Sequence, residues 1–99
     1  MVIKTDLSKF DEVVKIGKVI IDFYADWCGP CKMLAPIFEQ LSNEMKEVSF
    51  VKVDIDESQE LAQRFNISSI PTLLIFNNGQ LKRTLNGYKS KEELKMSLS

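Results

Sequence analysis

Two cysteines stand two residues apart, directly after the most apolar stretch of the chain, and this arrangement constrains the fold more than any other feature. They are Cys28 and Cys31, and the chain has no other cysteine. The preceding stretch, Val19–Ala25, is nearly continuously apolar, which is typical of a central strand covered on both faces. From Pro30 to about Lys46 apolar residues recur at helical spacing, and a proline suits the first turn of a helix. The pair is therefore predicted to lie where a buried strand passes into a long helix.

This position predicts different roles for the two thiols. On a helix that opens at Cys28, the side chain of Cys31 faces the same side three residues later, close enough for a disulfide. Free backbone N–H groups and the helix dipole favour a thiolate at the N-terminus by about 0.3–2 kcal/mol. We therefore predict reversible thiol–disulfide exchange, in which an accessible Cys28 attacks and a more deeply placed Cys31 resolves the mixed disulfide.

Other uses of such a pair are less well supported. Zinc and iron–sulfur sites need about four ligands. The chain offers no further cysteine and no histidine, so a metal site would have to be shared between two chains, and no bound metal is expected. An inert structural pair is a second alternative. It is disfavoured by Gly29 and Pro30, which stiffen the turn and leave it uncrowded for an incoming polypeptide.

The composition indicates one ordinary globular domain over residues 1–99, with 44% hydrophobic and 27% charged residues. A formal net charge of -1 without a Lys/Arg cluster argues against nucleic acid and anionic membranes as partners. The apolar stretches are too short to span a membrane. The first residues, Met1–Asp6, lack the basic and then apolar segment of a secretion signal, so a cytoplasmic location is expected unless a targeting segment has been removed.

The rest of the sequence predicts alternating short elements, with a kink at Pro36 in the long helix. Their order predicts an α/β fold of three layers, α/β/α, with a central mixed β-sheet flanked by helices. The first half is expected to form a helix that begins at Thr5 or Asp6 and ends near Gly17, the strand Lys18–Ala25, the helix Pro30–Lys46 and the strand Val48–Asp54. The helix Glu57–Phe65 should follow, with a capping box of Asp56 and Gln59. The chain should end with a hairpin of Thr72–Phe76 and Gln80–Leu85, turning at Asn77-Asn78-Gly79, and a last helix capped by Ser90 with Glu93.

Asp22 is anomalous because it interrupts an apolar strand. Burial of a carboxylate costs several kcal/mol unless the group is paired or protonated. One interpretation is a general base of raised pKa that deprotonates Cys31, and the alternative is an aspartate at a strand end facing solvent. Lys52 on a neighbouring strand is the candidate charge partner, although an exposed lysine on an alternating strand explains it almost as well.

The run Ala-Asp-Trp-Cys-Gly-Pro-Cys-Lys at residues 25–32 resembles the active-site signature of the thioredoxin family. The resemblance covers essentially the whole chain without a large insertion, and it implies the thioredoxin fold and reduction of protein disulfides in cell redox homeostasis. It also implies a monomer with no bound cofactor, which receives electrons from NADPH through a thioredoxin reductase. It continues through Asp22-Phe23-Tyr24, Pro36, Lys52-Val53-Asp54, Ile70-Pro71-Thr72, Asn78-Gly79 and Gly87.

The same resemblance implies roles for individual residues. Cys28 and Cys31 form the redox disulfide, Asp22 is the base, and a cis bond precedes Pro71. Tyr24 and Tyr88 depart from the commonest family pattern, and the bulky, hydroxyl-bearing Tyr88 is expected to alter which partners dock. The tuning residues implied for the thiols are Gly29, Pro30 and Lys52, and the implied substrate-binding residues are Trp27, Ile70, Pro71 and Gly87.

Three alternatives remain at this level. Without the resemblance, Trp27 could equally pack in the core. The chain could be a binding module of the same fold whose thiols turn over little. It could also be an oxidase or isomerase, although the Gly-Pro pair between the cysteines favours a reductase.

Overall fold

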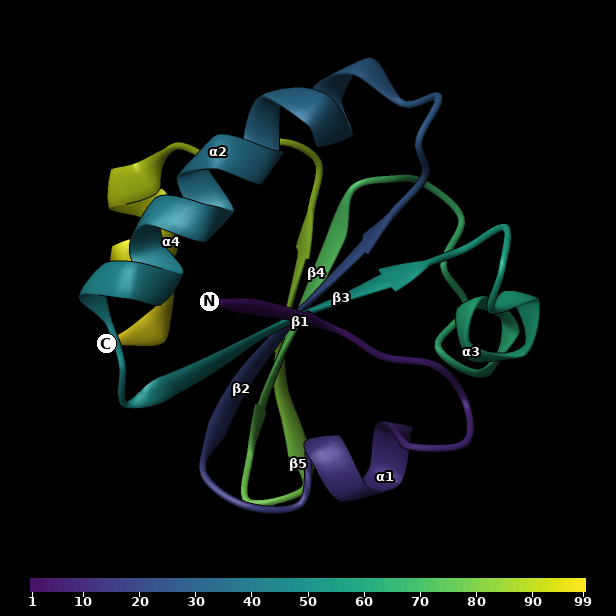
Figure 1. The fold of residues 1–99 in the computed structure, drawn as a ribbon, viewed down its shortest axis with the longest axis horizontal. Coiled ribbons are helices and arrows are strands. Elements are labelled where there is room, and N and C mark those ends of the chain that lie inside the picture. Colours follow the sequence, from purple (N-terminus) through teal and green to yellow (C-terminus); the bar gives the residue numbers. More distant parts are fainter.

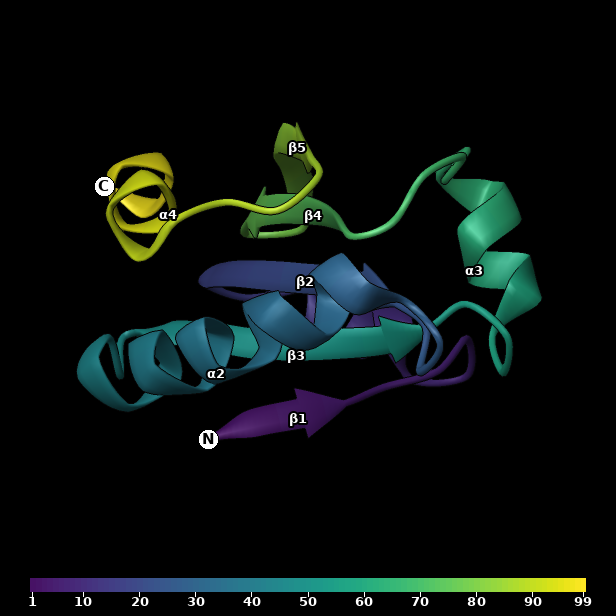
Figure 2. The same cartoon turned by 90° about the horizontal axis from the view of Figure 1, so that it is seen from above.

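A five-stranded mixed β-sheet crosses the centre of the protein in the computed structural model, which describes residues 1–99 (Figure 1). The strands lie side by side in the order β1-β3-β2-β4-β5, with β1 and β5 at the two edges (Figure 2). The first three strands of this order run parallel, and β4 and β5 are antiparallel to their neighbours. The elements are β1 (Val2–Lys4), α1 (Phe10–Val13), β2 (Lys18–Tyr24), α2 (Gly29–Glu44), β3 (Val48–Asp54), α3 (Gln59–Arg64), β4 (Thr72–Asn77), β5 (Gln80–Asn86) and α4 (Lys91–Leu98).

Helices cover both faces of the sheet, with α2 and α4 on one face and α1 and α3 on the other (Figure 1). Side chains alternate along a strand, so the central strand β2 contributes to both cores. Val19, Ile21 and Phe23 pack toward α1 and α3, whereas Ile20 packs toward α2 and α4. The alternation therefore directs Asp22, an even-numbered position, toward α2.

The α/β/α prediction is confirmed, but its N-terminal part is wrong in two respects. The edge strand β1, which pairs in parallel with β3, was not expected. The first helix has only four residues, and neither Thr5 nor Asp6 caps it. Instead, Oδ1 of Asp6 accepts hydrogen bonds from the N–H and the hydroxyl of Ser8, which closes a local turn.

The other elements begin and end within two residues of their predicted bounds. The hairpin turn has positive φ at Asn78 (50°) and Gly79 (85°), as a two-residue turn between twisted strands requires. Ser90 and Glu93 form the predicted capping box of α4. The box predicted for α3 is wrong, because Ser58 precedes that helix and makes no side-chain capping bond.

The long helix α2 continues through Pro36, and none of the helices is both long and apolar enough to cross a membrane. The carboxyl ends of the parallel strands β2 and β3 lie at the same edge of the sheet. The loop that leaves β2 carries both cysteines to the start of α2, so the site lies at this edge.

Candidate active site

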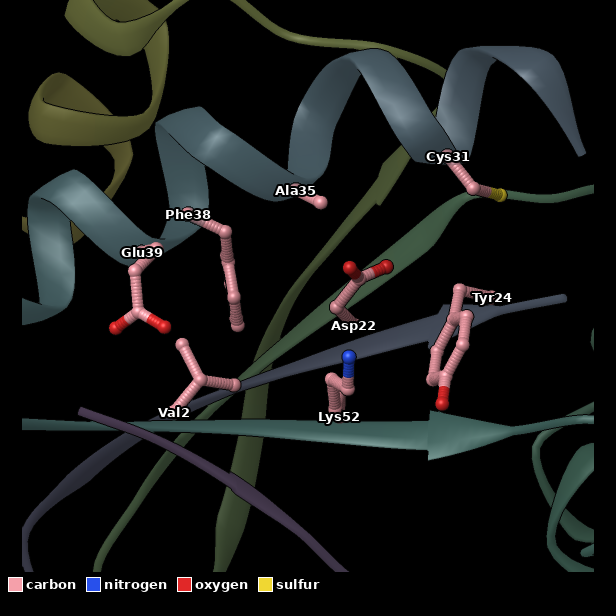
Figure 3. A pocket seen from close by; sticks show the side chains of 8 residues that line it. All are labelled: Val2, Asp22, Tyr24, Cys31, Ala35, Phe38, Glu39 and Lys52. Atoms are coloured by element: carbon pink, nitrogen blue, oxygen red, sulfur yellow. The ribbon is translucent and has the colours of Figure 1, made fainter. Parts of the chain in front are cut away.

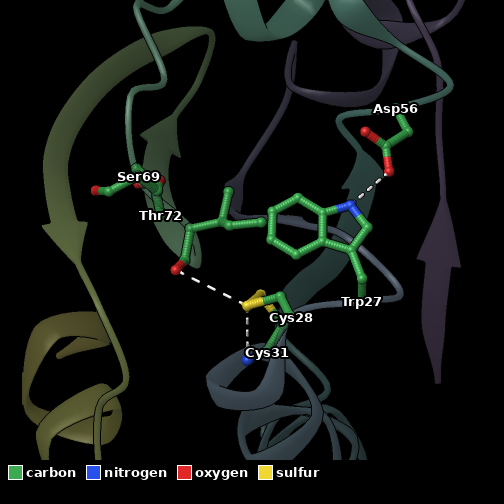
Figure 4. Close-up of a disulfide and its surroundings, with 7 residues drawn as sticks. Trp27, Cys28, Cys31, Asp56, Ser69 and Thr72 are labelled. Carbon is green, nitrogen blue, oxygen red and sulfur yellow. Dashed lines mark hydrogen bonds between the residues drawn. A yellow bond between two sulfur atoms is a disulfide. The ribbon is translucent and has the colours of Figure 1, made fainter.

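The two cysteines are joined by a disulfide, with their Cα atoms 5.2 Å apart, at the N-terminus of α2. Cys28 is the N-cap residue in an extended conformation, and Pro30 lies in the first turn. The Cys31 backbone N–H donates a hydrogen bond to Sγ of Cys28 at 3.2 Å (Figure 4). A backbone donor at a helix N-terminus stabilises negative charge on that sulfur once the disulfide is reduced.

The predicted difference in access between the two cysteines is absent from this oxidised form. Cys28 is 5% exposed and Cys31 is 4% exposed, so both are buried. The disulfide packs with Ala25 into a small apolar cluster, against which half-buried Ile70 lies. The residues between the cysteines remain exposed. In this oxidised form Cys28 therefore lies against apolar neighbours and not toward solvent.

The loop before β4 lies beside the disulfide. The Ile70 carbonyl oxygen is 3.9 Å from Sγ of Cys28, close enough to accept a hydrogen bond from the reduced thiol. The Ile70–Pro71 peptide bond is cis, as the family resemblance implied. The Gly87 N–H donates to the Pro71 carbonyl at 2.8 Å, so Gly87 joins the same surface. Its φ of 85° lies in the left-handed region that favours glycine.

Trp27 is 68% exposed, so the core-packing alternative is wrong. Its indole Nε1–H donates to Oδ2 of Asp56 at 2.9 Å (Figure 4). Sequence reasoning assigned Asp56 to a helix cap and missed this contact. The sheet topology could have indicated that Trp27 and Asp56 lie close together, because the loops that follow the neighbouring parallel strands β2 and β3 emerge at the same edge of the sheet.

Asp22 is buried beneath the thiols, and the solvent-facing alternative is wrong. It is 4% exposed, and its Oδ1 atom accepts no hydrogen bond from the protein. It lines a cavity of about 120 Å³ with Cys31, Phe38 and Lys52 (Figure 3). Burial raises the pKa of the Asp22 carboxyl to about 7, and the opposing effect of the Lys52 charge is smaller. This carboxyl can therefore gain or lose a proton near neutral pH.

Lys52 faces the same cavity from β3. It is the register partner of Asp22 on the neighbouring strand, and Figure 3 shows its ammonium group pointing toward that carboxyl. The ammonium also lies 4.7 Å from the centre of the Tyr24 ring, within the range of a cation–π contact. The half-buried Lys52 therefore lines the cavity and is not a freely exposed lysine.

Three features form one site. They are a reducible disulfide at the start of a helix, a carboxyl of raised pKa behind it and an exposed aromatic side chain beside it. No group of three or more His, Cys, Asp or Glu side chains is placed to hold a metal ion. Each residue singled out from the sequence lies at this site: Trp27, Cys28, Gly29, Pro30 and Cys31 in the turn, Ile70, Pro71 and Gly87 beside it, and Asp22 and Lys52 beneath it.

The sequence model of the family described as thioredoxin matches residues 1–99. The chain belongs to the thioredoxin family. It is 44% identical over 94 residues to a thioredoxin of Bacillus subtilis, covering 94% of this chain and 90% of that protein. It is 42% identical over 92 residues to a thioredoxin of Mycoplasmoides gallisepticum, covering 92% of each.

Solved structures agree with this assignment. The oxidised form of mitochondrial thioredoxin 3 from Saccharomyces cerevisiae superposes with a TM-score of 0.90 at 35% identity, covering 98% of this chain and 92% of that one. Thioredoxin from Malassezia sympodialis gives 0.89 at 38% identity, covering 98% and 89%. The chain therefore has the thioredoxin fold and is a thiol–disulfide oxidoreductase that reduces protein disulfides. As a member of this family it takes electrons from a thioredoxin reductase.

Proposed function

We propose that Cys28 is the nucleophile of this reductase and Cys31 the resolving thiol. The Cys28 thiolate attacks one sulfur of a substrate disulfide, which forms a mixed disulfide and releases the other sulfur as a thiolate. Cys31 then loses its proton and attacks Sγ of Cys28, which releases the second substrate sulfur as a thiolate and leaves the Cys28–Cys31 disulfide. Two electrons pass to the substrate, and its two thiolates take up one proton that came from Cys31 and one from solvent. The hydrogen bond from the Cys31 N–H to Sγ of Cys28 carries this assignment.

We assign the general base to Asp22. Its carboxyl shares a cavity with Cys31 and has a pKa of about 7, so it can take up the proton that Cys31 loses before the second attack. Lys52 tunes this step because its positive charge opposes the effect of burial. Gly29 and Pro30 tune the thiols by fixing the first turn of α2.

The proposed substrate-binding surface consists of Trp27, Ile70, Pro71 and Gly87. The Ile70 peptide group beside Cys28 can pair with the main chain of an extended substrate, which would read many polypeptides with little demand on their side chains. Trp27 adds exposed apolar area next to the sulfur. We propose that NADPH, acting through a thioredoxin reductase, regenerates the dithiol at the same surface.

We also propose that residues 1–99 act as one domain, as a monomer and in the cytoplasm. One sheet runs through the whole chain, which supports the single domain. Sedimentation of the reduced protein at micromolar concentration should give one species of about 11.3 kDa, and a dimer would contradict the proposal.

Insulin reduction driven by NADPH and thioredoxin reductase tests the assigned thiol roles. The wild-type protein should reduce insulin with multiple turnovers, whereas neither Cys28→Ser nor Cys31→Ser should do so. The two variants should differ in one respect: Cys31→Ser should accumulate a covalent mixed disulfide with insulin through Cys28, and Cys28→Ser should not.

Alkylation gives an independent test of the same assignment. Iodoacetamide added to the reduced protein near neutral pH should modify Cys28 first, because the helix N-terminus favours its thiolate. Faster modification of Cys31, or unimpaired turnover by Cys31→Ser, would overturn the proposed roles.

A further inference from the structure

The segment that precedes β4, Ser69–Pro71, is fastened at both ends by hydrogen bonds. The Thr72 hydroxyl donates to its first carbonyl oxygen at 2.6 Å, and the Gly87 N–H donates to its last carbonyl oxygen at 2.8 Å. Between these bonds lies Ile70, whose own carbonyl oxygen is 3.9 Å from Sγ of Cys28. The position of the Ile70 peptide group relative to the sulfur therefore depends on these two bonds.

The Thr72 hydroxyl also connects this segment to β5. Thr72 is 2% exposed, and its Oγ1 atom lies 3.3 Å from Oδ1 of Asn86, its register partner across the hairpin. A hydroxyl has one proton, which the shorter bond to Ser69 takes. A half-turn of the Asn86 amide lets an N–H of that side chain donate to the hydroxyl oxygen, so both contacts are satisfied together.

We propose that Thr72, supported by Asn86, is a positioning residue for substrate capture. Its buried hydroxyl holds the Ile70 peptide group in the orientation that an extended polypeptide requires, before the substrate arrives. Binding energy is then not lost to ordering the loop, as expected of a preorganised site. The hydroxyl does not touch either sulfur, so it affects the affinity for polypeptides and leaves the reactivity of Cys28 unchanged. This inference rests on the proposed role of Ile70.

Thr72→Val tests it, because valine keeps the branched shape and removes the hydroxyl. The KM for insulin should rise about five- to tenfold with kcat within about twofold, since the Ser69 carbonyl loses the hydrogen bond that holds the segment. The rate of reaction of the reduced protein with dithiobis(nitrobenzoate), a small disulfide that makes no main-chain pairing, should stay within about twofold. Thr72→Ser restores the hydroxyl and should return the KM to within about twofold of wild type.

Thr84→Val is the matched control, since Thr84 lies on β5 of the same hairpin, is exposed and makes no hydrogen bond through its side chain. Its KM should equal that of wild type. If Thr72→Val fails to fold, the exposed Asn86→Ala removes the support instead and should raise the KM about two- to threefold. An unchanged KM, or an equal loss of kcat and of the small-disulfide rate, would overturn the inference. A wild-type protein that reacts with the small disulfide and not with insulin would instead contradict the proposed function.

Discussion

At the scale of single residues, the role that we propose for Asp22 comes at the expense of stability. Its carboxyl lies in an apolar layer with one oxygen unpaired, and its pKa rises from 3.8 to about 7 because burial disfavours the charge. A residue chosen for stability alone would be apolar here. The same burial places the pKa where a general base works best at neutral pH.

Asp22→Asn should stabilise the protein in a way that depends on pH. Between 3.8 and about 7 the unfolded chain loses the Asp22 proton while the folded chain keeps it, so wild-type stability falls as pH rises. The advantage of the variant should grow by about 1.4 kcal/mol per pH unit in this window, to about 4 kcal/mol, and then level off. Urea unfolding at several pH values measures it, and an advantage that is constant with pH would contradict the raised pKa.

The same substitution should slow release of the substrate from Cys28. The Cys31→Ser variant cannot be used here, because it lacks the thiol that resolves the mixed disulfide. Decay of the mixed disulfide should therefore be followed by single-turnover quenching in proteins that keep both cysteines. At neutral pH we expect Asp22→Asn to resolve it at least about a hundredfold more slowly, the usual contribution of a general base. In wild type this rate should rise as pH passes about 7, and the variant should lack that rise. Equal rates in both proteins would exclude the proposed base.

Asp56 provides a second test at this scale, through its hydrogen bond with the only tryptophan of the chain. Asp56→Ala should let the Trp27 ring move, seen as faster decay of its fluorescence anisotropy. It should also raise the KM for insulin about two- to fivefold, because an ordered aromatic contact is lost. Glu60→Ala removes an exposed acid of α3 that has no ion-pair partner and should change neither quantity. Identical effects of the two substitutions would indicate a general charge effect.

At the scale of elements, prediction from sequence succeeded where local signals and tertiary packing agree. The strand β2, the helix α2 and the hairpin carry continuous apolarity, helical periodicity and an Asn-Gly turn, and all three are observed. It failed at β1, whose three residues are too few for a periodic pattern and whose strand exists through pairing with β3. It overestimated α1, because the polar side chain of Asp6 closes a turn with Ser8 before the helix begins.

The residues of the candidate site also divide into those that the sequence predicts and those that it does not. The thiol pair, Trp27 and the segment around Pro71 carry sequence signatures, and the structure brings them together. The contacts of Asp56 with Trp27 and of Thr72 with Asn86 join residues 29 and 14 positions apart. Such pairs depend on which strands become neighbours, so single residue types at these positions do not reveal them.

The capping box of α4 allows us to predict how much one helix cap contributes to the free energy of unfolding. Ser90 accepts a hydrogen bond from the Glu93 N–H at 3.2 Å, and the Glu93 carboxylate accepts one from the Ser90 N–H at 3.0 Å. Ser90→Ala should lower the free energy of unfolding by about 1 kcal/mol, whereas Ser90→Thr keeps a capping hydroxyl and should lose less. Urea unfolding measures this. Insulin reduction should be unaffected, because α4 packs against α2 away from the thiols, and a loss of activity would contradict that separation.

At the scale of the whole molecule, the sheet separates the core that lines the Asp22 cavity from a second core on its other face. The core under α2 and α4 includes Phe38, which lines the Asp22 cavity, and the core under α1 and α3 includes Phe10, which packs against Phe65 and Phe76. Both phenylalanines are buried, at 2% and 0% exposure. They form a matched pair with which stability and function can be separated.

Phe38→Leu and Phe10→Leu should each lower the free energy of unfolding by about 1–2 kcal/mol, through the cavity left behind. Only Phe38→Leu should lower the pKa of Asp22 below its value of about 7, because a larger cavity admits water and weakens the effect of burial. Carbon NMR titration of the Asp22 carboxyl measures that pKa in each variant. An equal pKa shift in both variants would mean that the carboxyl responds to overall destabilisation. An unchanged pKa in Phe38→Leu would mean that the side chains above the cavity do not control the proton, and the inferred link between the α2/α4 core and the Asp22 carboxyl would then be wrong.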